Sequence, residues 1–259
     1  MRTKRIDLME EYIFQEKSVS LDALCDKFQV SKNTIRRDID LLVKKGGIKK
    51  VYGGVKAEES YPSIKKVVPF ETRFMKFPEE KDRIAKAAAE FVEEKDVIYI
   101  DTGTTCLNIV DYISDKQCII LTSSLQVCIK AIPYPNLTVI SLPGKLKRET
   151  LSFVGEDIAN YLRTYNISKA FMACTGLTIE NGLTNGTYEE YHVKKAVIEN
   201  SRTHFLMADH SKFGNFSLMT FCKLDQLHHI ITDLPPANEY QAFCREHQIA
   251  IHTTPGKEE

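Results

Sequence analysis

Five consecutive residues, Asp101-Thr102-Gly103-Thr104-Thr105, have the composition of a phosphate-binding turn. They follow an apolar run, 97–100, and precede a predicted helix. Small residues let backbone N–H groups converge, threonine hydroxyls add donors, and a helix N-terminus favours an anion. The same residue types also make a simple helix cap. An enzyme uses such a site to react with a phosphorylated compound, whereas a sensor uses it to change shape.

Similar polar clusters follow four other apolar runs. Thr122-Ser123-Ser124 follows the second run and Pro143-Gly144 the third, the polar segment 175–190 follows the fourth, and Asp209 and Lys212 follow the fifth. Each cluster alone is more typical of a helix cap than of a ligand site. Because the carboxyl ends of parallel strands meet at one edge of a sheet, five clusters in register predict a pocket for a polar, anionic molecule.

The elements that must position these residues alternate along the chain after an alanine-rich helix at 79–94. Apolar runs predict strands at 97–101, 118–121, 137–141, 170–174, 204–208, 229–232 and 249–253. Helical patterns occupy 104–114, 124–131, 156–164, 188–201 and 236–247. Alternation of this kind indicates an α/β fold with a largely parallel sheet. The segment 142–155 lacks a helical period and is expected to form a hairpin or a loop, and we expect 175–190 to be flexible.

The first 57 residues differ in charge from the rest. They carry 13 Lys/Arg against 8 Asp/Glu, a net charge of +5, whereas the remainder carries 22 against 27, a net charge of −5. This asymmetry suggests that the N-terminal part meets a polyanion. Three amphipathic helices are predicted there, the second and third capped by Ser20 and Ser31 and the third stopped by Gly46-Gly47. The short link between the last two is typical of a helix-turn-helix.

The third helix exposes residue types that suit DNA. Arginine forks onto guanine edges or phosphates, and asparagine pairs with adenine. A short basic hairpin with a Gly53-Gly54 turn follows and resembles a wing along the phosphate backbone. A solvated basic helix in a small structural domain would explain the charge alone, but the three helices, the turn and the wing together favour DNA binding. The candidate DNA-binding residues are Ser31, Lys32, Asn33, Thr34, Arg36, Arg37, Lys49, Lys50 and Tyr52.

Both halves of the chain resemble one family. "VSKNTIRRDIDLL" followed by "GGIKKVYGGV" is similar to the N-terminal signature of DeoR-type bacterial regulators. The later motifs "FETR" before Lys-x-x-Ile-Ala, "DTGTT", Thr-x-Ser and "ADHSKFG" before "IITD" extend the resemblance over essentially all 259 residues. Departures are the Gly46-Gly47 pair, Tyr52 in place of a frequent histidine, Ser123 in place of asparagine and Pro143 in place of glycine.

The resemblance implies a winged helix-turn-helix domain over 1–57, a linker over 58–76, and a Rossmann-like sensor domain over 77–259 that is similar to ribose-phosphate isomerases. It implies a repressor of a sugar-catabolism operon whose operator binding responds to a phosphorylated sugar. Glu190 and Lys194 would contact the sugar, although a surface i,i+4 ion pair explains them equally well. The candidate effector-binding residues are Asp101, Thr102, Gly103, Thr104, Thr105, Thr122, Ser123, Gly144, Gly176, Glu190, Lys194, Asp209 and Lys212.

An active isomerase fused to a DNA-binding head is the alternative. Proton shuttling needs a carboxylate base over the substrate carbon. The isomerases that the chain resembles carry Asp-Gly-Ala-Asp, whereas the equivalent strand here ends "FMACTG", and the helix reads "YHVKK" where the base should stand. Glu189 and Glu190 lie one turn earlier and keep the alternative open. A regulator that is not an enzyme is the favoured interpretation, and an architectural protein would leave the pocket residues unexplained.

Composition narrows the class further. Seven scattered cysteines without a Cys-x-x-Cys motif favour reduced thiols in a cytoplasmic protein, and the histidines show no metal-ligand spacing. No apolar stretch reaches the roughly 20 residues of a membrane span. We therefore expect neither a metal nor a cofactor nor a membrane partner. The expected partners are double-stranded operator DNA, a phosphorylated sugar and further copies of the chain in a homodimer or homotetramer.

Overall fold

The computed structural model describes residues 2–45, 48–57, 68–155 and 157–256. The chain divides into two compact units, Met1–Ser63 and Ile64–Glu259. Gly46-Gly47 and residues 58–67 of the predicted linker lie outside the described residues. Within the described part, no helix is long and apolar enough to cross a bilayer.

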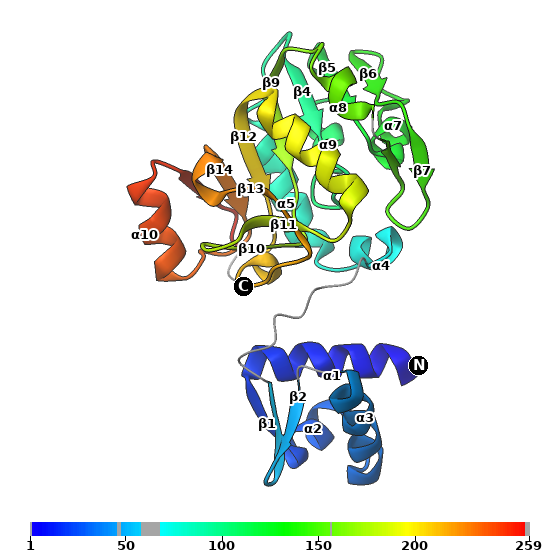
Figure 1. Cartoon of the computed structure of the whole chain (residues 1–259), viewed down its shortest axis with the longest axis vertical. Coiled ribbons are helices and arrows are strands. Elements are labelled where there is room, and N and C mark those ends of the chain that lie inside the picture. The colour runs from blue at the N-terminus through cyan, green and yellow to red at the C-terminus, as the bar shows by residue number, and fades with distance from the viewer. Residues whose placement is uncertain (1, 46–47, 58–67, 156, 257–259) are drawn as a thin grey trace. The chain divides into compact units, whose positions relative to one another are not determined.

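The N-terminal unit contains the three predicted helices and the wing (Figure 1). Its elements are α1 (Arg2–Glu16), β1 (Ser18–Ser20), α2 (Leu21–Phe28), α3 (Lys32–Lys45), β2 (Ile48–Val51) and β3 (Gly54–Ala57). Strand β1 was not predicted, because three residues are too short for a periodic signal. It pairs with β3 and buries Val19 in the core of the unit. The core is otherwise built from the apolar faces of the helices, as the spacing predicted.

The C-terminal unit is built on a seven-stranded sheet in which every neighbouring pair is parallel. Its order is β15-β14-β12-β9-β4-β5-β6. The strands are β4 (Val97–Ile100), β5 (Cys118–Thr122), β6 (Leu137–Ser141), β9 (Ile167–Met172), β12 (Ser201–Met207), β14 (His229–Thr232) and β15 (Ala250–Thr253). They confirm the predicted α/β sheet, because strands buried on both faces read as continuous apolar runs.

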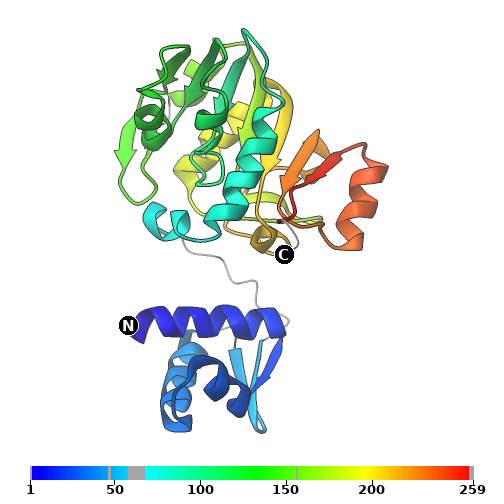
Figure 2. The same cartoon turned by 180° about the vertical axis from the view of Figure 1, so that it is seen from behind.

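Helices cover both faces of this sheet (Figures 1 and 2). One face packs against α5 (Pro78–Ala89), α6 (Ile109–Tyr112) and α7 (Leu125–Ala131). The other packs against α8 (Ile158–Leu162), α9 (Tyr188–Glu199) and α10 (Asn238–Glu246). Alternate residues of β4 serve the two cores: Tyr99 faces α9, whereas Ile98 and Ile100 face α5.

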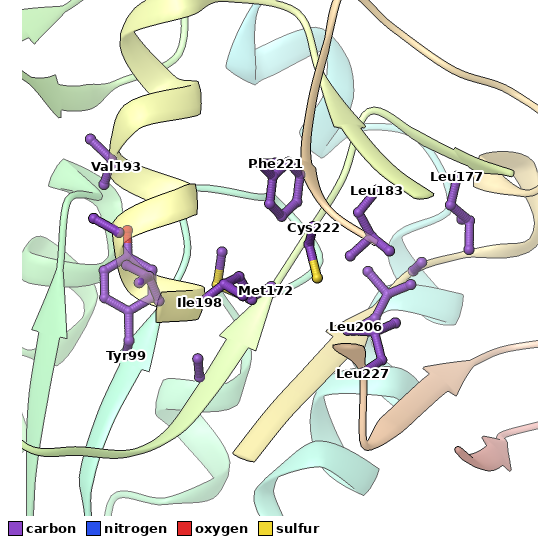
Figure 3. Close-up of a cluster of buried hydrophobic side chains, with 14 of the residues drawn as sticks. Tyr99, Met172, Leu177, Leu183, Val193, Ile198, Leu206, Phe221, Cys222 and Leu227 are labelled. Carbon is purple, nitrogen blue, oxygen red and sulfur yellow. The ribbon is translucent and has the colours of Figure 1, made fainter. Parts of the chain in front are cut away.

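A second, antiparallel sheet corrects the expectation that 175–190 is flexible. It contains β10 (Gly176–Thr178), β11 (Gly182–Asn185) and β13 (Met219–Cys222). Leu177 and Leu183 are fully buried and pack with Phe221 and Leu206 in the cluster of Figure 3. This burial orders a segment whose composition is polar. The predicted excursion at 142–155 is a hairpin of β7 (Lys145–Lys147) and β8 (Ser152–Val154).

A histidine pair on the outer strands predicts a pH-dependent stability. His229 Nδ1 and His252 Nε2 lie 3.1 Å apart, and the His229 ring stacks on Phe205. Burial lowers the pKa of both imidazoles from 6.5, and the proximity of His252 contributes at His229. Because the folded state holds them neutral, the unfolded chain protonates first as the pH falls. Their stabilisation is therefore complete above about pH 6.5 and is lost as the pH falls below it.

Urea unfolding at about pH 8 and about pH 5.5 checks this expectation. The midpoint should fall on acidification, and His252→Gln should reduce the fall. His247→Gln is the matched control, because His247 is exposed at the end of α10. An identical pH dependence in wild type and His252→Gln would contradict the assignment.

Candidate functional site

The carboxyl ends of β4 and β9 mark the switch point of the parallel sheet. From β4 the chain continues to β5 and β6 on one side, and it returns through β9 to β12 and β14 on the other. Asp101 bridges the two strand ends: its N–H donates to Phe171 O at 3.0 Å, and its Oδ2 accepts from Ala173 N at 2.9 Å. Open α/β sheets bind ligands at such a point.

Lys194 of α9 completes this bridge. Its Nζ pairs with the Asp101 carboxylate and donates to Ala173 O at 2.9 Å. Both side chains are almost fully buried. Glu190 accepts instead from the Thr187 hydroxyl at 3.2 Å. The i,i+4 surface pair between Glu190 and Lys194 is therefore not the arrangement in the folded protein, because the lysine turns inward to Asp101.

The turn after Asp101 lies against the end of β9. A Cβ on Gly103 would lie 2.2 Å from the Cβ of Ala173, so the close approach requires glycine. Thr102, Thr104 and Thr105 are buried beside it. The predicted helix over 104–114 is wrong in extent: residues 104–108 are turns, and α6 covers Ile109–Tyr112 alone. Hydrogen bonds between residues i and i+3, such as Cys106 N to Gly103 O, form these turns. The dipole of a long helix therefore does not add to anion binding at this turn.

The neighbouring hydroxyls have structural partners. Thr122 Oγ1 donates to Ile100 O at 2.7 Å, and the Ser123 and Tyr99 hydroxyls lie 2.8 Å apart. Two predicted glycines are needed for close backbone contacts. A Cβ on Gly144 would lie 2.6 Å from Val154 O, and one on Gly176 would lie 2.5 Å from Asn215 O.

One small cavity joins several of the predicted residues. Its volume is about 10 Å³, close to the space of a single water molecule. The lining residues are Asp101, Thr102, Ser123, Ser152, Phe153, Val154, Glu190, Val193 and Lys194. Strand β8 supplies three of them, which sequence reasoning missed because it looked for clusters at the ends of the parallel strands, and β8 does not belong to that sheet. The cavity is too small for a sugar phosphate, and strand β8 forms one of its walls.

A second charged pair stands at the end of β12. Asp209 is 1% exposed, and its Oδ1 accepts from the backbone and side chain of Ser211. Among the described residues its Oδ2 has no hydrogen-bond partner, and it lies 4.0 Å from Lys212 Nζ. Cys174 is affected by the charges of both pairs: burial raises its pKa to about 12, and the charges of Lys212 and Lys194 act on it in the opposite direction. We refer to the edge of the sheet at the ends of β4, β9 and β12, where these groups lie, as the crevice.

Sequence reasoning missed Lys81 of α5, which also belongs to this crevice. It is 4% exposed, and its Nζ donates to Arg73 O. Burial lowers the pKa of Lys81 to about 8. The charge of Asp209 raises this pKa, whereas the charges of Lys212 and Arg73 lower it further. A signal existed: Lys81 shares the i, i+3, i+4 apolar stripe with Ile84 and Ala85. A lysine on a buried stripe is a candidate functional residue.

The N-terminal unit presents the predicted recognition face. Ser31 caps α3 through Thr34 N at 3.4 Å, and its hydroxyl also bonds that of Thr34. Lys32, Asn33, Arg36 and Arg37 are exposed. Ile35 and Ile39 of the same helix are buried and fix its orientation in the unit.

The wing differs from the expectation at its tip. Tyr52 and Gly53 form the turn, with Gly53 at φ +78°, and Gly54 begins β3 instead. Tyr52 is fully exposed. Two candidate cations have acidic partners in the free protein: Lys32 with Asp22 at 2.5 Å, and Lys50 with Asp40. DNA phosphates would have to replace these exposed pairs, which cost little to break.

Two family models match the chain. Residues 5–61 match the DeoR-like helix-turn-helix domain, and residues 76–234 match the DeoR C terminal sensor domain. The chain belongs to the DeoR family. This assignment confirms the resemblance seen in the recognition helix and in the motifs of the sensor domain, and it makes the protein a DNA-binding transcriptional regulator.

Curated relatives of this DeoR-family protein span its whole length. The HTH-type transcriptional regulator IolR of Bacillus subtilis (strain 168) is 46% identical over 97% of this chain and 99% of its own. The Glycerol-3-phosphate regulon repressor of Escherichia coli (strain K12) is 28% identical over 96% of this chain and 98% of its own length. Relatives named as regulators agree with the expectation that the protein is not an enzyme.

A solved D-ribose-5-phosphate isomerase in complex with phospho-erythronic acid is 18% identical over 54% of this chain and 55% of its own, with a TM-score of 0.40. Similarity this weak transfers neither a ligand nor an activity to the DeoR-family protein.

Proposed function

We propose that this protein represses a sugar-catabolism operon and that a phosphorylated sugar in the crevice changes its operator binding. In this proposal residues 1–57 bind DNA and residues 77–259 bind the effector, in a cytoplasmic homodimer or homotetramer. Relatives named for a glycerol-3-phosphate regulon and for a lactose phosphotransferase system support a response to phosphorylated carbohydrate.

The observation that carries the proposal is the charge balance around Lys81. The charges of Lys212, Arg73 and Lys76 act on this buried ammonium, and Asp209 is the carboxylate that acts on it most strongly. The cations around Lys81 disfavour another cation and stabilise an anion. A phosphate dianion is the anion that the neighbouring hydroxyl-rich turn fits best.

The other end of the crevice suits a sugar hydroxyl. The buried Oδ2 of Asp209 lacks a hydrogen-bond partner among the described residues, and an unsatisfied buried carboxylate oxygen is costly. A hydroxyl that donates to it would remove this cost. We place the phosphate between residues 102–105 and the cations around Lys81, and the sugar hydroxyls near Asp209 and Glu190. Adjacent strands lie about 4.8 Å apart, so a ligand from β4 to β12 spans about 10 Å.

A thermal-shift panel tests the proposal. Ribose 5-phosphate, fructose 6-phosphate, glucose 6-phosphate and glycerol 3-phosphate are compared with their unphosphorylated forms. A ligand of the folded state raises the melting temperature by mass action. At least one phosphate ester should stabilise the protein while its parent sugar or polyol does not. Equal shifts for both forms would remove the phosphate from the proposal.

Thr104→Val is expected to abolish the response to the stabilising ester and to leave DNA binding intact. The substitution removes a hydroxyl from the turn at nearly constant volume, and the turn belongs to the C-terminal unit. Gel shifts with a promoter fragment that the wild type binds, with and without the ester, give both readouts. Thr138→Val, at an exposed position of β6, is the matched control. A Thr104→Val protein that releases DNA at the wild-type ester concentration would mean that the phosphate binds elsewhere.

A further inference from the structure

The short helix α4 (Phe70–Phe74) is the first described element after residues 58–67. Phe70 is buried, and its N–H donates to Glu149 O in the loop between β7 and β8 at 2.9 Å. Both views of the fold show α4 beside the tip of that hairpin (Figures 1 and 2). The same hairpin closes the small cavity through Ser152, Phe153 and Val154. Helix α4, which lies in the second half of the predicted linker 58–76, and the effector crevice therefore share one supporting element.

A groove of about 310 Å³ lies beside α4 and shows which other residues are near this helix. It is lined by Phe70, Phe74 and Met75 on the helix side, and by Leu107 and Leu151 on the opposite side. Leu107 lies two residues after the turn 101–105, and Leu151 directly precedes β8. The groove thus joins α4 to the segment that follows the phosphate turn and to the hairpin.

Arg73 contacts both the described end of the predicted linker, at Val68, and the buried Lys81. Its Nε donates to Val68 O at 3.0 Å. Val68 is the first described residue after residues 58–67. Its guanidinium lies 5.7 Å from the Phe70 ring centre. Its own carbonyl accepts from Lys81 Nζ, which ties the residue to the buried cation of the crevice.

Two of the three carboxylates that act on this guanidinium line the small cavity, and the third, Glu71, belongs to α4. Burial lowers the pKa of Arg73, and the carboxylates of Glu190 and Asp101, which line the cavity, act against that effect. Asp101 is already paired with Lys194, and Glu190 accepts from a neutral hydroxyl. A phosphate in the turn would add two negative charges to this side. Hydrogen bonds from a guanidinium to an anion are about twice as strong as those to a neutral carbonyl, and they can be bidentate.

We propose that Arg73 binds the anion in the crevice, and that this capture withdraws its guanidinium from Val68 and loosens the end of the linker. This inference rests on the proposed phosphate site at residues 102–105. Arg73 is then both an effector ligand and the residue that transmits binding to the segment leading to the DNA-binding unit. Effector binding and DNA binding are coupled through one side chain with two alternative partners.

Hydrogen–deuterium exchange on the full-length protein tests the proposal, with inorganic phosphate as the probe and chloride at matched ionic strength as the reference. Phosphate should protect residues 101–105 and should speed exchange over residues 70–75 by about tenfold, the change that corresponds to one lost charge-assisted hydrogen bond. Arg73→Gln should exchange fast over 70–75 without phosphate and show no further increase. Arg73→Lys, which keeps the charge, should retain protection at 101–105 and lose the effect on 70–75.

Arg83→Gln is the matched control, because Arg83 Nε donates to a backbone carbonyl, Thr254 O, in the same geometry at 2.9 Å. Its response to phosphate over 70–75 should equal that of the wild type. Protection of 101–105 with unchanged exchange over 70–75 would overturn the role of Arg73 and leave the phosphate site standing. Absence of protection at 101–105 would overturn the phosphate site and the role of Arg73 together.

Discussion

Replacing Lys194 with methionine is expected to lower the free energy of unfolding by about 3–5 kcal/mol, the usual cost of breaking a buried ion pair from one side. Asp101 is 1% exposed and would be left with one backbone donor, Ala173 N, and without the cation that is paired with it. Urea unfolding followed by circular dichroism at neutral pH measures the loss.

Lys195→Met is the matched control for this prediction. Lys195 is the next residue on α9, and its pair with Glu199 is exposed and 4.0 Å long, so its loss should cost less than about 1 kcal/mol. Asp101→Asn in the Lys194→Met background should recover part of the stability, because the uncompensated charge is removed. Equal losses for Lys194→Met and Lys195→Met would show that the pair contributes nothing as a buried charge.

Arg37→Ala is expected to weaken binding to a promoter fragment by about 1–3 kcal/mol and to reduce the slope of log affinity against log salt by about 1. The side chain is exposed on α3, two residues from the buried Ile35 and Ile39 that hold the helix in place. The substitution should therefore leave the fold unchanged. Gel shifts over a salt series give the affinity and the slope.

Arg245→Ala removes the same charge from an exposed position of α10 and is the control for Arg37→Ala. It should leave both the affinity and the slope at wild-type values. If Arg37→Ala also leaves them there, α3 is not the helix that approaches the phosphates.

Local patterns predicted most elements of this fold. Ser20, Ser31 and Ser124 each cap the helix that follows, because a serine oxygen satisfies a free backbone N–H wherever a helix begins. The seven parallel strands were predicted because each contains a short run of apolar residues. Strands β10, β11 and β13 were missed because strands of three or four residues carry no period of their own, and because β11 pairs with the distant β13, as between Leu183 and Cys222.

The candidate site divides in the same way. Residue order predicts polar turns after the strands, and the parallel connection of those strands brings the turns to one edge of the sheet. Which charges meet there depends on the tertiary fold. Asp101 and Lys194 are 93 positions apart and form one buried pair, and Lys81 donates to the carbonyl of Arg73 from a helix that no polar cluster marked. Residue type and spacing determine local hydrogen bonding and burial, whereas the partner of a buried charge depends on long-range packing.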